Sequence, residues 1–131
     1  MTNQQIHQAF LSTTYKVLNP VIDIKINSKI AALDSLPSWA FITAWNPLPE
    51  VLPLEANKDR SHQLAQDIKN LGLQYSHGIG VSEDEQWSEE SFFIENITLE
   101  KANELAVKYG QLAFVWGEKN GIATLVYTIL P

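Results

Sequence analysis

The chain has no cysteine, and this absence excludes several kinds of chemistry. Without thiols there is no disulfide framework, no thiol nucleophile and no zinc site with cysteine ligands. Basic residues are also few, because nine Lys and Arg stand against 15 Asp and Glu, for a net charge of −6. Proteins that bind nucleic acid non-specifically need many cations to neutralise phosphates, so we expect no nucleic acid partner.

Long apolar runs and targeting signals are missing as well. No apolar stretch reaches the ~20 residues of a membrane helix. The opening residues, MTNQQIHQAF, lack the basic region and apolar run of a signal peptide. We therefore expect a cytoplasmic protein with no membrane partner. What is present, 45% apolar and 10% aromatic residues in a chain of 131, is sufficient for one globular domain over residues 1–131.

The N-terminal third predicts a helix followed by two strands. Apolar residues recur at loosely helical spacing over the first 18 residues, and we expect a helix over about residues 3–14. Three isoleucines alternate with polar residues in VIDIKI, residues 21–26, which is typical of a half-buried strand. After a short helical turn near Leu33, a second strand over residues 39–45 leads into Asn46 and Pro47.

The remainder alternates helices and strands. A proline-broken loop ends at Asn57, a good N-cap for a helix that Gly72 stops. Strand-like segments follow at residues 73–81 and 91–96, and a second helix runs from a Thr98 cap to Gly110. Two final strands flank an Asn-Gly turn. The apolar positions that we expect in the core are Ile42, Leu64, Ile68, Phe92, Leu105, Phe114 and Leu125.

This order predicts the fold class. From Trp39 onward it reads strand, helix, strand, strand, helix, strand, with one hairpin strand added. That is an α+β ferredoxin-like split β-α-β sandwich with a mostly antiparallel sheet, an N-terminal helix and strand extension and a C-terminal hairpin strand. Right-handed crossovers place the strand at 91–96 between its two antiparallel neighbours.

The same topology predicts that polar residues from distant segments meet at one rim of the sheet. The strand at 39–45 ends where the strand at 91–96 begins, and both the first helix and the last core strand start at that edge. The residues expected along this rim are Asn46, Asn57, Arg60, Trp87, Glu89, Glu90, Ser91 and Gln111.

Several short motifs together resemble a known family. FITAWNP at residues 41–47, Asn57 and Arg60, WSEES at 87–91 and YGQLAFVW at 109–116 resemble the bacterial domain of unknown function 3293. The resemblance runs in the same order from about Tyr15 to Val126. It implies a small bacterial protein whose motif residues act as a set, and it supplies no activity, so whether the chain is an enzyme stays open.

Each rim residue has a structural role as an alternative to a functional one. Asn46 before Pro47 can start a turn or face a ligand. Asn57 is favoured as a helix cap, and Arg60 either binds an anion at the helix start or pairs with Glu89 or Glu90. We favour the ion pair for Arg60.

The remaining rim residues allow a similar choice. Adjacent residues of a strand face opposite sides, so of the two acids only Glu89 shares a face with Ser91, which makes it the better general base or arginine partner. Trp87 is expected to pack rather than stack on a ligand, and Gln111 to satisfy carbonyls at the helix end.

Metal and cofactor sites are not predicted. His7, His62 and His77 have no metal-ligand spacing, and the glycines of GIG at residues 78–80 are too few for a phosphate loop. A Ser91–His77–Glu89 triad lacks a nucleophile-elbow motif.

Two functions of different classes remain. The first, which we favour, is a rim site that binds a polar small molecule, with or without catalysis. The second is an inhibitor-like or immunity-type module that presents the acidic loop 83–90 to a basic protein. It is suggested by residues 70–100, which contain seven acidic side chains and no Lys or Arg.

Overall fold

A seven-stranded antiparallel sheet organises the chain. The structure is a computed structural model, and it describes residues 2–47 and 50–130; residues 48 and 49, within the predicted proline-broken loop, lie outside these ranges. Over the described residues, the helices are α1 (Asn3–Ser12), α2 (Leu54–Asn70) and α3 (Leu99–Lys108), with a 3-10 turn at Ala31–Leu33. The strands are β1 (Thr14–Leu18), β2 (Val21–Ile24), β3 (Ser38–Thr43), β4 (Tyr75–Val81), β5 (Ser88–Glu95), β6 (Ala113–Glu118) and β7 (Thr124–Tyr127).

The strand order confirms the predicted fold. The order across the sheet is β2-β1-β4-β5-β3-β6-β7, and every neighbouring pair is antiparallel. Within it β4, β5, β3 and β6, with α2 and α3 as crossovers, form the split β-α-β arrangement. β5 lies between β4 and β3, as the right-handed crossovers predict.

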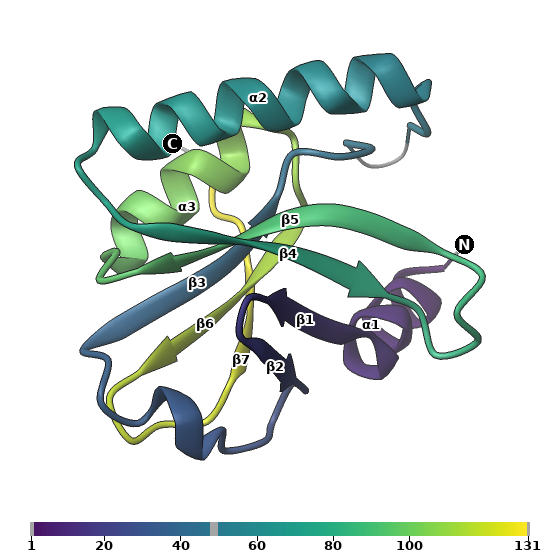
Figure 1. Cartoon of the computed structure of the whole chain (residues 1–131). Coiled ribbons are helices and arrows are strands. Elements are labelled where there is room, and N and C mark those ends of the chain that lie inside the picture. The colour runs from purple at the N-terminus through teal and green to yellow at the C-terminus, as the bar shows by residue number, and fades with distance from the viewer. Residues whose placement is uncertain (1, 48–49, 131) are drawn as a thin grey trace.

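One face of the sheet packs against α2 and α3, which lie together on that side in Figure 1. The side chains of this first core include Ile42, Leu64, Ile68 and Phe114, all buried as predicted. Phe92 and Leu105 are buried with them, whereas Leu125 is only half-buried and packs against the other face. The helices were thus placed correctly, and six of the seven predicted core residues are buried.

The opposite face encloses a second core because the sheet curls. The backbone N–H of Asn27 donates to Ala123 O at 2.7 Å, and Ala123 N donates to Ser28 O at 2.9 Å, so the segment after β2 meets the segment before β7. The side chains enclosed in this way include Tyr15, Ile24, Trp39, Phe41 and Phe93. The N-terminal extension therefore covers the face that α2 and α3 leave open (Figure 1).

Two boundary predictions were wrong. Residues 14–18, whose apolar side chains we counted in the helical spacing although the predicted helix ends near residue 14, form β1, where Tyr15 and Val17 are buried on alternate positions. Helix α2 begins at Leu54 with Pro53 at its N-cap, so Asn57 is not the cap but lies inside the first turn. By contrast, Thr98 caps α3 by accepting a hydrogen bond from Lys101 N, and Gly110 follows that helix with a φ of 68°.

Candidate functional site

Asn46 follows the end of β3 in a left-handed backbone conformation, with a φ of 44°. Asparagine tolerates this region better than most residues, because its short amide can hydrogen-bond locally. The next residue, Pro47, packs on Gly110 after α3, where an added Cβ would lie only 2.7 Å from Pro47 Cβ. The Asn-Pro and Tyr-Gly motifs therefore fit against each other, and this contact fixes how the chain leaves β3.

The side chains of Asn46 and Asn57 form a reciprocal pair. Asn57 Nδ2 donates to Asn46 Oδ1 at 2.9 Å, and Asn46 N donates to Asn57 Oδ1 at 2.9 Å. Leu52 completes the pair, since its N–H donates to Asn46 Oδ1 at 2.9 Å and its carbonyl accepts from Asn57 Nδ2 at 3.3 Å. Asn57 is 2% exposed and Asn46 7% exposed, so these amides are interior groups that join β3 to the start of α2.

Arg60 binds backbone carbonyls. Its Nε donates to Ala44 O at 2.6 Å, and its Nη2 donates to Tyr109 O, the C-cap residue of α3. The guanidinium carbon also lies 5.6 Å from the centre of the Tyr109 ring. A cation is favourable at a helix C-terminus, which carries partial negative charge. The predicted pairing of Arg60 with Glu89 or Glu90 was therefore wrong.

Gln111 supplies a third link at the same end of α3. Its Nε2 donates to Trp45 O at 2.9 Å and to Tyr109 O at 3.2 Å. This is the predicted role, because one of these acceptors is a carbonyl at the helix end. We call Asn46, Asn57, Arg60 and Gln111 the polar cluster. Together they connect the end of β3, the first turns of α2 and the C-terminus of α3.

Glu89 is the residue that links the polar cluster to the surface. Asn46 Nδ2 donates to Glu89 Oε2 at 2.9 Å, and the indole Nε1 of Trp87 donates to the same oxygen at 3.2 Å. Burial raises the pKa of Glu89 above its ordinary value, and these two hydrogen bonds oppose the shift in part. Trp87 itself is 48% exposed, so of the two packed positions that we expected for it, core or rim, it occupies the rim.

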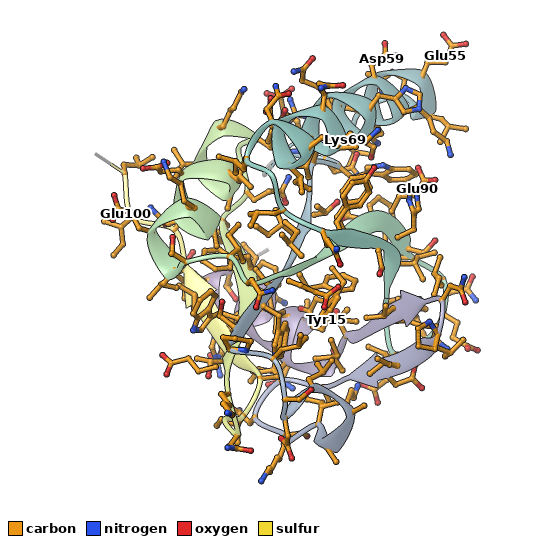
Figure 2. All side chains as sticks on the ribbon, turned by 60° about the vertical axis from the view of Figure 1, so that its left-hand side comes forward. Tyr15, Glu55, Asp59, Lys69, Glu90 and Glu100 are labelled. Atoms are coloured by element: carbon orange, nitrogen blue, oxygen red, sulfur yellow. The ribbon has the colours of Figure 1, made fainter. Side chains whose placement is uncertain are left out.

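Ser91 and Glu90 lie on opposite faces of β5, as alternation predicts. Buried Ser91 lies on the same face as Glu89, and its Oγ donates to the Glu89 carbonyl at 3.1 Å. Glu90 faces the helices and pairs with Lys58 of α2 at 2.7 Å. In Figure 2 Glu90 lies near α2, whereas Tyr15 lies across the sheet from that helix. Because Glu89 and Glu90 lie on opposite faces of β5, they cannot act together on one ligand.

The structure thus brings the predicted rim residues into one network, with different roles within it. Asn46 and Trp87 each donate a hydrogen bond to Glu89, while Asn57 binds Asn46 and both Arg60 and Gln111 bind backbone carbonyls. Sequence reasoning missed Ser61, which is buried and accepts a hydrogen bond from Trp45 Nε1 at 2.9 Å. A signal was available, since Asn57, Ser61, Leu64 and Ile68 follow helical spacing along one face of α2.

Other chemistry finds little support in the part of the chain that the structure describes. His77 is opposite Phe92 in the β4–β5 pair and so faces the helices, away from Ser91, which rules out the triad. No three His, Asp or Glu side chains gather as metal ligands within residues 2–47 and 50–130. Across the same ranges, none of the helices combines the length and apolar character needed to span a bilayer.

Two shallow surface depressions lie away from the polar cluster. One, of about 280 Å³, is lined by residues of α2 and α3 that include Asp67, Lys101 and Lys108. The other, of about 570 Å³, is lined by Ser12, Ser82, Glu83 and Asp84, between the end of α1 and the β4–β5 hairpin. The second adjoins the β4–β5 hairpin, which carries Glu89 on β5 and Trp87 just before it.

Comparison with known protein families finds one family that includes the residues described above. The family described as Protein of unknown function (DUF3293) matches residues 42–114, more than half of the chain. The chain belongs to this family. The DUF3293 match spans the whole polar cluster together with Trp87, Glu89 and Ser91, although it is shorter than the resemblance from Tyr15 to Val126 expected from the motifs. No curated protein and no solved structure matches the chain.

Proposed function

We propose that the protein binds a small polar molecule at the rim, with Glu89 and Trp87 in contact with it and the polar cluster holding them in place. The observation that carries this proposal is the state of Glu89. Its carboxylate is half-buried near the start of β5, is oriented by Asn46 and Trp87, and has a raised pKa. A carboxyl group that is held by fixed donors and moved toward neutrality by burial suits ligand binding and proton transfer.

The other rim residues hold the Glu89 carboxylate in position through contacts within the protein. Asn57, Arg60 and Gln111 donate mainly to backbone carbonyls and to Asn46, so their hydrogen bonds are made within the protein. Ser91 lies under Glu89 and donates to its carbonyl. We assign these four residues a positioning role, because they fix the place of Asn46 and Glu89.

A thermal-shift screen of metabolites tests the proposal, since a molecule that binds only the folded state raises the melting temperature. Wild type is compared with Glu89→Gln and with Glu90→Gln, a matched control that removes the neighbouring carboxylate from the opposite face. We expect at least one compound to stabilise wild type and Glu90→Gln equally and Glu89→Gln much less. A screen in which each active compound stabilises all three proteins alike would count against the rim.

A second function is supported by the loop between β4 and β5. Glu83, Asp84 and Glu85 are exposed there, and the ion pairs found among the described residues include none of the three. Ser82 Oγ donates to Asp84 at 2.7 Å and Gln86 N donates to it at 3.0 Å, which gives the loop a fixed form. Such a loop suits an acidic interaction surface of the inhibitor type.

The two functions respond to different substitutions. Binding of a basic protein through the loop should fall steeply as salt rises and should weaken in a Glu83→Gln/Glu85→Gln double variant. It should not depend on Glu89. A small-molecule site at the rim gives the reverse pattern, because the double variant leaves Glu89 and its two donors unchanged.

A further inference from the structure

We infer that the ligand of the rim is a cation that donates N–H groups, either an alkylammonium or a guanidinium. This inference rests on the proposed binding at the rim and names the class of molecule bound. It follows from which hydrogen-bonding atoms the rim has already used, from the indole beside them, and from the charges nearby.

The donors of the polar cluster are directed into the protein. Asn57 Nδ2 and Gln111 Nε2 each donate to two protein oxygens. Arg60 directs Nε and Nη2 at the carbonyls of Ala44 and Tyr109. An anionic ligand would need such donors, and those named here already make the contacts that hold β3 to α2 and α3.

Glu89, in contrast, offers an acceptor. Both of its side-chain hydrogen bonds fall on Oε2, and no donor within residues 2–47 or 50–130 is bound to Oε1. Hydrogen bonds between an ionised carboxylate and a cationic N–H are shorter and stronger than neutral ones. The atom that the rim leaves for a ligand is therefore a carboxylate oxygen, which selects a donor with positive charge.

Trp87 adds an exposed aromatic ring next to the same carboxylate. Its N–H bond to Glu89 fixes the indole edge, and about half of the residue is exposed. Ammonium and guanidinium groups bind over an indole face through the attraction of a cation to the ring. Glu89 and Trp87 thus combine a carboxylate with an aromatic ring, and both groups attract organic cations.

The charges around Glu89 agree with this choice. Gly80 lies directly opposite Glu89 in the β4–β5 pair, and a Cβ added there would make ordinary van der Waals contact with Thr13 Cγ2 at 3.8 Å and Tyr15 Cδ1 at 4.0 Å. Glu83 and Asp84 line the depression farther along the same hairpin. Lys58 is bound to Glu90 on the other face, and Lys25 Nζ donates to Ser12 O at 2.9 Å, next to that depression. Glu83, Asp84 and Glu89 outnumber Lys25 among these groups, which favours a positive ligand.

The cation has two sources that share this chemistry. It is a free amine or guanidine, or it is a lysine or arginine side chain of a basic protein. We test both with 1,5-diaminopentane, arginine methyl ester and a short lysine- and arginine-containing peptide. Two matched probes of similar length, 1,5-pentanediol and glutarate, supply the neutral and anionic comparisons.

Binding is followed by NMR through the indole N–H signal of Trp87, which is assigned by its loss in Trp87→Phe. We expect saturable shifts with the cations and none with pentanediol or glutarate. The affinity for the cations should fall about tenfold or more in Glu89→Gln and stay within about twofold in Glu90→Gln, since tenfold corresponds to loss of one charge-assisted contact.

The outcomes separate this inference from the proposed function. If a neutral or anionic compound binds in a Glu89-dependent way and no cation binds, the inference that the ligand is a cation is wrong, whereas the proposed rim site is supported. Equal weakening in Glu89→Gln and Glu90→Gln overturns the cation site, because it shows only general attraction to an acidic protein. No response at Trp87 to any probe or screened metabolite removes the rim site itself. Glu89-dependent binding supports the inference, and a peptide affinity at least tenfold above that of the free cations assigns the source to a partner protein.

Discussion

The polar cluster and the hairpin edge lie side by side at the rim, and they use their polar groups in opposite ways. In the cluster, the amides of Asn46 and Asn57 are buried and bonded to protein atoms. At the hairpin edge, which we define as Trp87 and Glu89, the indole is half exposed and one carboxylate oxygen has no described donor. Family motifs therefore combine residues that stabilise the fold with residues that face solvent.

This difference has a physical cause. A buried amide without partners destabilises a fold by about 1–3 kcal/mol for each unsatisfied group, so interior polar residues must be paired. A carboxylate at an edge can turn part of its hydrogen-bonding capacity to solvent or to a ligand. Substitutions in the two regions should accordingly separate effects on stability from effects on binding.

The largest expected effect is from Asn57→Ala. The substitution removes three side-chain hydrogen bonds and leaves Asn46 N and Leu52 O without their side-chain partner. We expect the free energy of unfolding to fall by about 2–4 kcal/mol, measured by urea denaturation. Gln66→Ala, on the exposed side of the same helix, is the control and should change stability by less than about 0.5 kcal/mol. A loss below 1 kcal/mol at Asn57 would show that the cluster is not a stabilising unit.

A somewhat smaller effect is expected from Gly110→Ala. The φ of 68° disfavours a side chain, and the new Cβ would meet Pro47 Cβ at 2.7 Å. We expect a loss of about 1–3 kcal/mol, because backbone strain and a close contact act together. Gly72→Ala is the matched control: its φ is 72°, yet an added Cβ there meets no atom within 4 Å. Both free energies of unfolding are measured by urea denaturation, and the difference between the two losses gives the contribution of the Pro47 contact. Equal losses would show that this contact does not contribute to stability.

Part of this arrangement was predictable from the sequence, and the rest was not, for identifiable reasons. Helix α3 was located correctly because a threonine cap, an apolar stripe and a glycine stop agree. The start of α2 was misplaced because Asn57, a typical capping residue, is used inside the helix to bind Asn46. β1 was missed because its short alternation follows a helix directly. The partners of Arg60 are backbone carbonyls, which have no sequence signature.

At the hairpin edge, Trp87→Phe should have little effect on folding. A smaller aromatic ring replaces the indole, and the N–H that donates to Glu89 at 3.2 Å is lost. Because Trp87 is half exposed, we expect the free energy of unfolding to change by less than about 1 kcal/mol. Trp45→Phe is the comparison, since it removes a similar N–H bond from a half-buried position, to the buried hydroxyl of Ser61. A larger loss for Trp87→Phe than for Trp45→Phe in urea denaturation would contradict the distinction between the two regions.

The smallest expected effect on stability is from Glu89→Gln, and its sign depends on pH. Burial raises the pKa of Glu89, so the folded state favours the protonated form. The stability linked to this proton is fully present below the unfolded pKa of about 4.3 and is lost as pH rises through the folded pKa. Glutamine keeps an acceptor for Asn46 and Trp87 and does not ionise. The variant should therefore gain stability relative to wild type as pH rises from acid to neutral, in melting temperatures measured across that range.

Glu90→Gln should instead be slightly less stable than wild type at neutral pH, by less than about 1 kcal/mol, because it breaks the exposed ion pair with Lys58. If Glu89→Gln lost stability steadily as pH rose, the carboxylate would be a stabilising charge in the fold, and the hairpin edge would belong with the polar cluster and not with a binding site.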